Sequence, residues 1–187
     1  MEKHLKQESA NCIKIVLFGP ESTGKTTLSR QLARYYNSVW VPEYAREYLQ
    51  DKWNNERKTC EPKDILPIAE GQIKLENDLA KKTDSVLICD TDLLETKVYS
   101  EAYYSGTCDP VLEKYAIENT YHLYFLTYID TPWEADDLRD KPKHRLEMFE
   151  AFENELIKYK RPYILLKGNK SVRLKTAINH IDKLLKK

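Results

Sequence analysis

The residues with the clearest chemical potential lie at positions 19–26, GPESTGKT, which fit the pattern G-x-x-x-x-G-K-[ST] of a phosphate-binding loop, or P-loop. Gly19 and Gly24 can adopt backbone angles that a Cβ would forbid, so the amides between them can turn inward around an anion. Lys25 is expected to reach the β- and γ-phosphates of a nucleotide, and the Thr26 hydroxyl to ligate Mg²⁺. The spacing therefore predicts binding of a nucleoside triphosphate.

The segments on either side of this loop are those that a P-loop requires. The apolar run Ile13–Phe18 predicts a buried strand, and Leu28 and Leu32 recur at helical spacing after the loop. A Gly-rich turn between an arbitrary strand and helix is therefore the weaker interpretation. Thr27 is the next hydroxyl along the chain and is expected to meet the α-phosphate. The remaining loop residues expected to contact the nucleotide are Glu21, Ser22 and Thr23.

Two aspartates follow the next strongly apolar run, SVLIC at residues 85–89. A carboxylate at the end of a buried strand, as Asp90 is here, is typical of the element that holds the Mg²⁺ shell in P-loop proteins. Asp92 is a candidate to orient an acceptor or take up its proton. Asp and Thr are also ordinary caps for a following helix, and from sequence both interpretations stay open.

A second group of charged residues follows the short apolar stretch SVWV at residues 38–41, which Pro42 is expected to end. Glu43 and Arg46 are three residues apart and share one face of a predicted helix. They form either a solvated helix face or, because they follow the carboxyl end of a strand, part of the ligand crevice of an α/β sheet.

The segment DTPWEADDLRDKPKHR, residues 130–145, is dense in charge and contains two prolines. A mobile lid over the phosphates would have this composition, with Arg139 or Arg145 neutralising charge as the phosphoryl group transfers. A solvated surface loop would look similar. We expect a lid near residues 131–145 and place both arginines at the nucleotide.

Five apolar strands alternate with helices along the chain, which predicts an α/β fold with a parallel sheet, helices on both faces and Ile13–Phe18 at the centre. No linker, repeat or low-complexity tract divides the 187 residues, so residues 12–187 are expected to form one domain. Residues 1–11 are polar and are expected to form a disordered tail.

The composition argues against several classes of protein. Lys+Arg and Asp+Glu balance at 30 each, and a nucleic-acid binder usually has a basic excess. No apolar run approaches the roughly 18 residues that span a membrane, and the N-terminus does not read as a signal peptide. The four cysteines lie far apart, which suits reduced thiols in a cytoplasmic protein. The sequence carries no signal for oligomeric state.

Several of these segments together resemble one family. GPESTGKTTL, PEYAREYL, ICDTDLLET and DTPWEADDLRD followed by Arg145 resemble the small P-loop ATPase and kinase family that includes the NadR-type ribosylnicotinamide kinase domains. The resemblance extends over about residues 13–183. A vast superfamily shares the P-loop, whereas the other three segments are far more specific.

The resemblance implies ATP-dependent phosphorylation of the 5′-hydroxyl of nicotinamide riboside with Mg²⁺ as cofactor, which yields nicotinamide mononucleotide. It implies a three-layer P-loop fold with strand order 2-3-1-4-5. In the E-Y-x-R-E block, Tyr44 is expected to contact the substrate, and Arg46 to bind either the substrate or a phosphate. The larger regulator protein that contains such a kinase domain also carries further domains, so this chain is expected to be the kinase part standing alone. A carboxylate should orient the acceptor hydroxyl, and Glu43, Asp90 and Asp92 are the candidates.

One position departs from the family pattern. In the members that phosphorylate the riboside, an aromatic residue that stacks on the nicotinamide ring precedes the Glu-Tyr pair, and Pro42 stands there here. Trp40 lies two residues earlier and, by strand alternation, points to the same side. Trp40 is therefore expected either to take over this substrate contact or to be a core residue.

Two other functions stay open on sequence. A kinase of another nucleoside would carry the same motifs. A regulatory ATPase with a protein partner would also carry the P-loop, but it would hydrolyse ATP slowly without any small-molecule acceptor.

Overall fold

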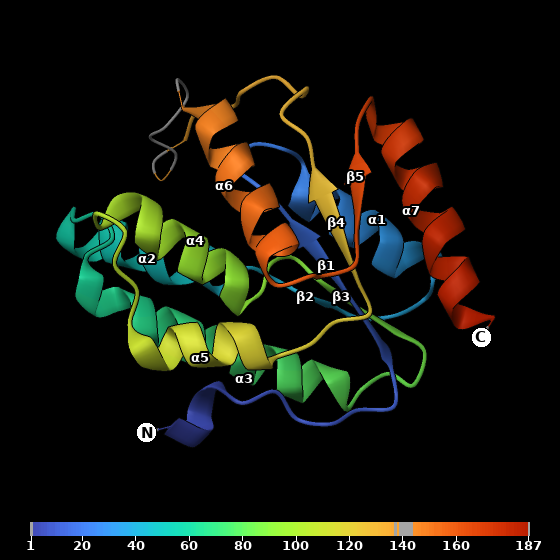
Figure 1. Cartoon of the computed structure of the whole chain (residues 1–187), viewed down its shortest axis with the longest axis horizontal. Coiled ribbons are helices and arrows are strands. Elements are labelled where there is room, and N and C mark those ends of the chain that lie inside the picture. Colours follow the sequence, from blue (N-terminus) through green and yellow to red (C-terminus); the bar gives the residue numbers. More distant parts are fainter. Residues whose placement is uncertain (1, 137, 139–143, 187) are drawn as a thin grey trace.

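The computed structural model describes residues 2–136, 138 and 144–186, and it shows a central sheet between two layers of helices (Figure 1). The strands are β1 (Ile13–Phe18), β2 (Trp40–Val41), β3 (Val86–Cys89), β4 (Leu123–Thr127) and β5 (Tyr163–Leu166). The α-helices are α1 (Lys25–Tyr35), α2 (Tyr44–Glu56), α3 (Ile65–Ala80), α4 (Leu93–Tyr103), α5 (Pro110–Glu118), α6 (Arg145–Lys158) and α7 (Lys170–Leu185), and two short 3₁₀ turns are η1 (Glu2–Leu5) and η2 (Pro62–Asp64).

The sheet has the strand order β2-β3-β1-β4-β5, and every neighbouring pair is parallel. Both the parallel sheet and the order 2-3-1-4-5 are therefore confirmed. β1 lies in the middle, paired with β3 and β4, which explains why its residues form an apolar run rather than an alternating pattern. The carboxyl ends of parallel strands meet at one edge, and the loops that follow them form the crevice where ligands bind in such sheets.

Two hydrophobic cores lie on the two faces of this sheet. Phe18 and Tyr124 belong to the larger core, which the helices α3 to α6 cover, and their rings pack edge to face at 5.4 Å. Leu17 and Phe125 point to the other face and pack with residues of α1 and α7. In Figure 1, α1 and α7 lie on one side of the strands, while α4, α5 and α6 lie on the other.

The N-terminal segment differs from the tail that the sequence predicts. Leu5 is 1% exposed and packs into the larger core. The Gln7 side chain donates to Glu76 at 2.7 Å, and the Glu8 amide donates to Asn77 Oδ1 at 2.8 Å. These contacts hold residues 5–8 against α3, whereas the few apolar residues of the segment give no periodic signal in the sequence.

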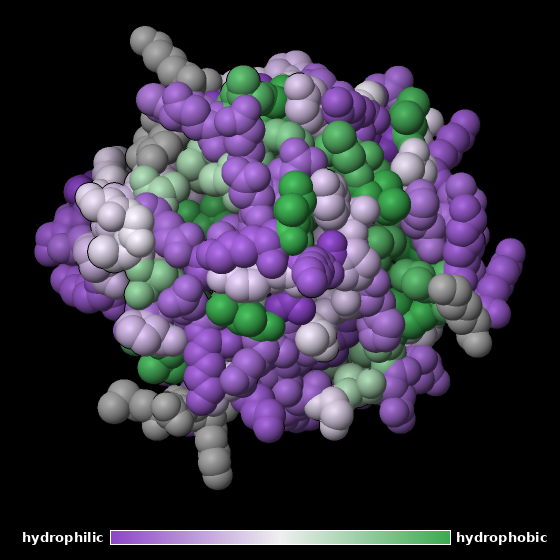
Figure 2. Space-filling view, in the orientation of Figure 1, coloured by the Kyte–Doolittle hydropathy of each residue, from purple (hydrophilic) through white to green (hydrophobic). Residues whose placement is uncertain are grey.

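The surface offers no helix for a bilayer: within the described part of the chain, none is long and apolar enough to cross a membrane. The face shown in Figure 2 is mostly hydrophilic, with hydrophobic side chains interspersed among polar ones.

Candidate active site

The P-loop, residues 19–24, joins the carboxyl end of β1 to α1. Gly24 has φ +85° and Gly19 has φ +134°, angles that L side chains rarely adopt. A Cβ on Gly19 would also lie 2.8 Å from Thr127 Oγ1, so this position has no room for a side chain. Gly24 and Thr26 are exposed at the start of α1, where a helix N-terminus favours an anion.

Contacts from neighbouring strands and helices hold the loop in shape. Thr23 Oγ1 donates to Pro20 O and shares a second hydrogen bond with Thr127 Oγ1, each at 2.7 Å. Arg173 of α7 is 4% exposed and donates to Thr23 O at 2.6 Å, while it also pairs with Asp130. Sequence reasoning missed Arg173, because its role depends on a loop 150 positions away in the chain.

The Lys25 ammonium lies inside the loop and is 8% exposed. It donates to Gly19 O at 2.6 Å and to Pro20 O at 3.0 Å, and it forms an ion pair with Glu95 Oε1 at 3.1 Å. Burial lowers the pKa of Lys25, but the carboxylates around it, first of all Glu95, outweigh burial and raise the pKa above its ordinary value. Lys25 is therefore charged and placed where a nucleotide would present its phosphates.

Asp90 follows β3 and is 1% exposed, and neither of its carboxylate oxygens has a hydrogen-bond partner among the described residues. Burial and, second, the charge of Glu43 raise the pKa of Asp90 to about 6, while the nearby Thr26 hydroxyl and Lys25 act in the opposite direction. Thr26 and Asp90 thus offer oxygen atoms, the ligand type that Mg²⁺ prefers. They fit this ion, which usually takes one or two protein ligands together with phosphates and water.

Asp92 has a different place from the one that the sequence suggested. Thr91 before it has φ +114°, a strained angle for a β-branched residue, and the chain turns sharply there. Asp92 Oδ1 accepts from the Glu95 amide at 2.9 Å, and Oδ2 accepts from Tyr124 Oη at 2.7 Å. Asp92 is 1% exposed, so in this structure it is the buried cap of α4 rather than a free carboxylate that meets a substrate.

Glu95 is the site residue that the sequence reasoning missed. It lies in the first turn of α4, is 2% exposed and contacts Lys25. Burial raises the pKa of Glu95 to about 8; Lys25 opposes this rise and Glu43 adds to it. The available signal was its position three residues after the helix cap Asp92, which places it in the first helical turn beside the end of β3.

Glu43 lies at the start of α2 and is the third carboxylate of the site. It is half-buried, and its charge contributes to the raised pKa values of Lys25, Asp90 and Glu95. Gln72 of α3 fixes the backbone on both sides of Glu43, because it accepts from the amide of the next residue at 2.8 Å and donates to the carbonyl of the preceding one at 3.2 Å. The structure thus brings Glu43 together with the P-loop, as predicted.

Tyr44 and Arg46, which belong to the same E-Y-x-R-E block as Glu43, contact other parts of the protein. The Tyr44 ring packs so closely on Gly71 of α3 that a Cβ there would lie 2.0 Å from it. Arg46 forms a two-pronged contact with Asp136, at 3.2 Å and 2.6 Å, which joins α2 to the segment after β4. Contact of either side chain with a substrate stays a proposal.

Trp40 is a core residue in this structure, which is one of the two roles expected of it. Its side chain packs with the core on the α1 and α7 face of the sheet, and the Arg30 guanidinium lies 5.2 Å from the centre of its ring. Val41 faces the opposite core, to which Leu93 and Leu94 of α4 also belong. Strand alternation thus places Trp40 and Val41 on opposite faces of the sheet.

The first part of the predicted lid contacts the P-loop. Ser22 O accepts from the Thr131 hydroxyl at 2.9 Å and from Arg145 at 3.2 Å, and Ser22 Oγ accepts from the Glu134 amide at 2.9 Å. The Arg145 guanidinium also lies 5.7 Å from the centre of the Trp133 ring. Arg145 is therefore at the loop, as predicted, whereas Arg139 lies outside the described residues.

Aromatic side chains surround a small cavity next to the loop. Tyr99 and Tyr103 of α4 lie one turn apart, with ring centres separated by 6.2 Å, and Trp133 faces them. The cavity is completed by Pro20, Glu21, Arg145 and Met148. Glu95 lies one turn before Tyr99, so the residue that pairs with Lys25 and the first of these aromatic rings lie on the same face of α4.

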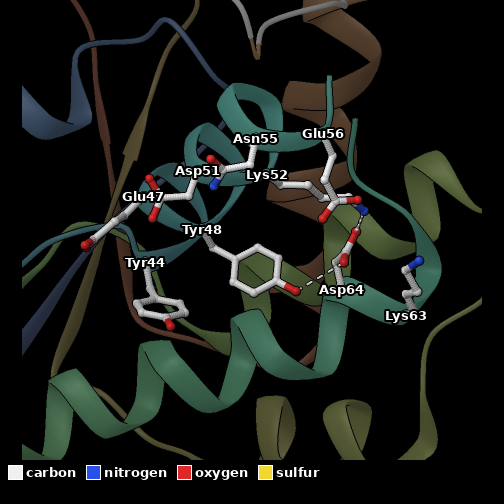
Figure 3. A pocket seen from close by; sticks show the side chains of 9 residues that line it. All are labelled: Tyr44, Glu47, Tyr48, Asp51, Lys52, Asn55, Glu56, Lys63 and Asp64. Atoms are coloured by element: carbon white, nitrogen blue, oxygen red, sulfur yellow. Dashed lines mark hydrogen bonds and ion pairs between the residues drawn. The ribbon is translucent and has the colours of Figure 1, made fainter. Parts of the chain in front are cut away.

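A larger groove of about 450 Å³ lies between α2 and the start of α3 and does not include the P-loop (Figure 3). Lys52 pairs with Asp64 at 2.5 Å and with Glu61 at 2.7 Å, and Tyr48 Oη donates to Asp64 at 3.2 Å. Its most buried charges therefore neutralise one another. We assign the active site to the P-loop edge, where buried carboxylate oxygens lack partners among the described residues.

Comparison with known sequences relates this chain to a protein family and to a curated protein. The model of a family described as an AAA domain matches residues 14–173. The trifunctional NAD biosynthesis/regulator protein NadR of Salmonella typhimurium (strain LT2) is 30% identical over 125 residues, which are 67% of this chain and 30% of that protein. The chain thus spans less than a third of the length of this curated relative.

Two solved structures have a similar fold. The NadR protein in complex with NR superposes with a TM-score of 0.78 at 22% identity, over 100% of this chain and 53% of that chain. Deoxyadenosine kinase from M. mycoides superposes with a TM-score of 0.69 at 16% identity, over 91% of this chain and 100% of that chain. The chain therefore shares the fold of these two proteins.

Proposed function

This chain belongs to the AAA domain family, and we propose that it is an ATP-dependent kinase that phosphorylates nicotinamide riboside to nicotinamide mononucleotide. The observation that carries the proposal is the cluster around Lys25, where Glu43, Asp90 and Glu95 surround one buried ammonium at the P-loop. Such a cluster offers more carboxylates than metal binding needs, which favours an acceptor hydroxyl as a further ligand. The similarity to NadR, whose name includes NAD biosynthesis, supports this acceptor.

The nucleotide would lie along the start of α1. The loop amides and the Lys25 ammonium would hold its phosphates, and Arg145 and Arg139 are the proposed lid cations that balance developing charge. Thr26 and Asp90 would hold Mg²⁺, which supplies charge neutralisation at the phosphates.

The acceptor would enter from the side of α2 and α4. Glu43 is the more exposed carboxylate there and is proposed to bind the sugar hydroxyls, with Tyr44 and Arg46 further along α2. The rings of Tyr99 and Tyr103 offer a surface for a planar base. Asp92 is not proposed in this role, because both of its oxygens are already bound.

The direct test is release of ADP from Mg·ATP with and without nicotinamide riboside, combined with mass detection of a riboside product heavier by one phosphoryl group. We expect ADP release that depends on the riboside, and the phosphorylated product. The variant Lys25→Ala serves as the inactive control, and E118Q, an exposed change at the end of α5, as the matched neutral control.

Each alternative outcome identifies a different function. Stimulation by another nucleoside, but not by nicotinamide riboside, would keep the mechanism and change the substrate. Slow hydrolysis that is the same with every small molecule would contradict the kinase and indicate a regulatory ATPase.

A further inference from the structure

Glu95 is a buried carboxylate whose oxygens lack the partners that burial normally requires. It is 2% exposed, and neither oxygen has a hydrogen-bond partner among the described residues apart from the ion pair with Lys25 at 3.1 Å. A buried carboxyl group without a full set of partners is costly and calls for an explanation, and a ligand group that binds there during the reaction is one such explanation.

The Lys25 ammonium has no donor to spare in this state. It has three N–H donors, and Gly19 O, Pro20 O and Glu95 lie within reach of them at 2.6, 3.0 and 3.1 Å. To bind a phosphate oxygen, Lys25 must release one of these partners. The two carbonyls belong to the loop that encloses the phosphates, whereas Glu95 approaches from α4 on the acceptor side.

We propose that Glu95 is a catalytic residue that changes partners: the phosphates replace it on Lys25, and the freed carboxylate accepts the hydrogen bond of the acceptor hydroxyl. This inference rests on the proposed kinase function and deepens it. It assigns the acceptor end of the reaction to α4 rather than to Asp92, and it makes donor and acceptor binding depend on each other.

Glu95 suits this role better than Glu43 does. Glu43 is half-buried and forms no ion pair with Lys25 among the described residues, whereas Glu95 contacts Lys25 directly. The pKa of Glu95 is raised to about 8 by burial, and Glu43 adds to the rise, which brings it close to the pH at which a proton acceptor works best. One turn further along the same helix, Tyr99 lines the small aromatic cavity beside the P-loop.

In the proposed phosphoryl transfer, one bond to phosphorus forms and one breaks. The acceptor hydroxyl oxygen forms a bond to the γ-phosphorus of ATP, and the bond between that phosphorus and the β–γ bridging oxygen breaks. The electron pair of the broken bond leaves with ADP. The hydroxyl proton passes to the Glu95 carboxylate and from there to water.

The first experiment measures how nucleotide binding changes acceptor binding. Nicotinamide riboside is titrated calorimetrically into the full chain with and without Mg²⁺ and a non-hydrolysable ATP analogue. In the wild type we expect the riboside to bind about fivefold or more tightly when the nucleotide is present, because nucleotide binding frees Glu95. In E95Q this coupling should be lost, whereas E43Q should weaken riboside binding equally in both conditions.

The second experiment measures turnover. E95Q is expected to lower kcat by about 10²-fold with little change in the KM for ATP, while E118Q matches the wild type. E95D keeps the charge but withdraws it by one methylene group, and it should lower kcat without loss of nucleotide affinity. This second variant tests the inference even where E95Q does not fold.

The outcomes separate this inference from the function on which it rests. A wild type that phosphorylates no nucleoside contradicts both the kinase and the role of Glu95. A wild type that phosphorylates the riboside, together with Glu95 variants that keep full coupling and full kcat, contradicts only the role of Glu95. If another nucleoside is the substrate, that nucleoside is used as the probe in both experiments.

Discussion

Lys25 has three partners in this structure and stands where negative charge would develop during phosphoryl transfer. Lys25→Ala is therefore expected to lower kcat by about 10²–10³-fold, the usual effect of removing one preorganised stabilising group. Glu43→Gln should cost less, because a loose transition state needs charge neutralisation more than a strong base. Arg139→Ala is predicted to resemble Lys25→Ala.

Steady-state kinetics of the three variants with saturating ATP and acceptor test this ranking. Circular dichroism of each variant controls for loss of the fold. A larger loss of kcat for Glu43→Gln than for Lys25→Ala would reverse the assignment of roles.

Glu95 should make stability depend on pH in a known direction. Its pKa is raised by burial from 4.5 to about 8, so between these values the folded state holds the proton more tightly than the unfolded state. Its contribution to the free energy of unfolding is full below about pH 4.5 and is lost as the pH rises towards 8. The size is roughly 1.4 kcal/mol for each pKa unit of difference between the two states.

Denaturant unfolding of the wild type and E95Q at about pH 5 and pH 8 measures this effect. The free energy of unfolding of the wild type minus that of E95Q should decrease as the pH rises. Asp90 and Asp92 titrate in both proteins, so their contributions largely cancel in this difference. A difference that stays constant or increases would show that Glu95 is ionised throughout this range.

At the scale of elements, α4 organises the acceptor side of the site. The helix begins after the strained residue Thr91 and is capped by Asp92. Glu95 and Tyr99 lie one turn apart on the same face of this helix, next to the P-loop. The fully buried Lys97 of α4 forms ion pairs with Glu101 of the same helix and with Glu155 of α6, which fixes α4 against α6. A single helix thus fixes both the carboxylate beside Lys25 and the aromatic rings.

The contact between α2 and α3 gives a prediction that runs against helix propensity. Replacement of a helical glycine by alanine usually stabilises a protein, but a Cβ on Gly71 would lie 2.0 Å from the Tyr44 ring. Gly71→Ala is therefore expected to destabilise the protein by about 1–3 kcal/mol through overpacking. Thermal or denaturant unfolding measures the change.

A double-mutant cycle provides the control for this prediction. In the background Tyr44→Ala the clash is absent, so Gly71→Ala should become neutral or stabilising. Destabilisation of the same size in both backgrounds would show that the ring of Tyr44 is not the cause.

At the scale of the whole molecule, the two ends of the parallel strands have different roles, and we call them the carboxyl edge and the opposite edge of the sheet. The carboxyl edge carries the P-loop and the three carboxylates. The opposite edge is closed by the N-terminal segment and by the buried pair Lys14–Glu76, at 2.9 Å, which also receives the Tyr121 hydroxyl at 2.6 Å. Stability and chemistry are therefore expected to respond separately to changes at the two edges.

Leu5→Ala tests this separation. Leu5 is 1% exposed, and its truncation should lower the free energy of unfolding by about 2–4 kcal/mol and leave kcat unchanged at temperatures where the protein is folded. His4→Ala, at an exposed neighbouring position, is the control and should have little effect. Equal stabilities of the Leu5 and His4 variants would mean that the segment contributes nothing in solution.

The sequence alone determined the local features: the P-loop, the five strands, and the positions of Glu43 and Asp90 at strand ends. These follow from the spacing of apolar residues and from glycines that the backbone geometry requires, and both are properties of neighbours in the chain. The family resemblance added the strand order, which the structure confirms.

Only the tertiary structure decided which side chains meet. It made Asp92 a buried helix cap, placed Trp40 in a core, anchored Leu5 in the other core and brought Glu95 to Lys25. The physical reason is that contacts between residues 70 or more positions apart, such as Lys25 with Glu95, depend on how strands pair and helices pack, which no short pattern specifies.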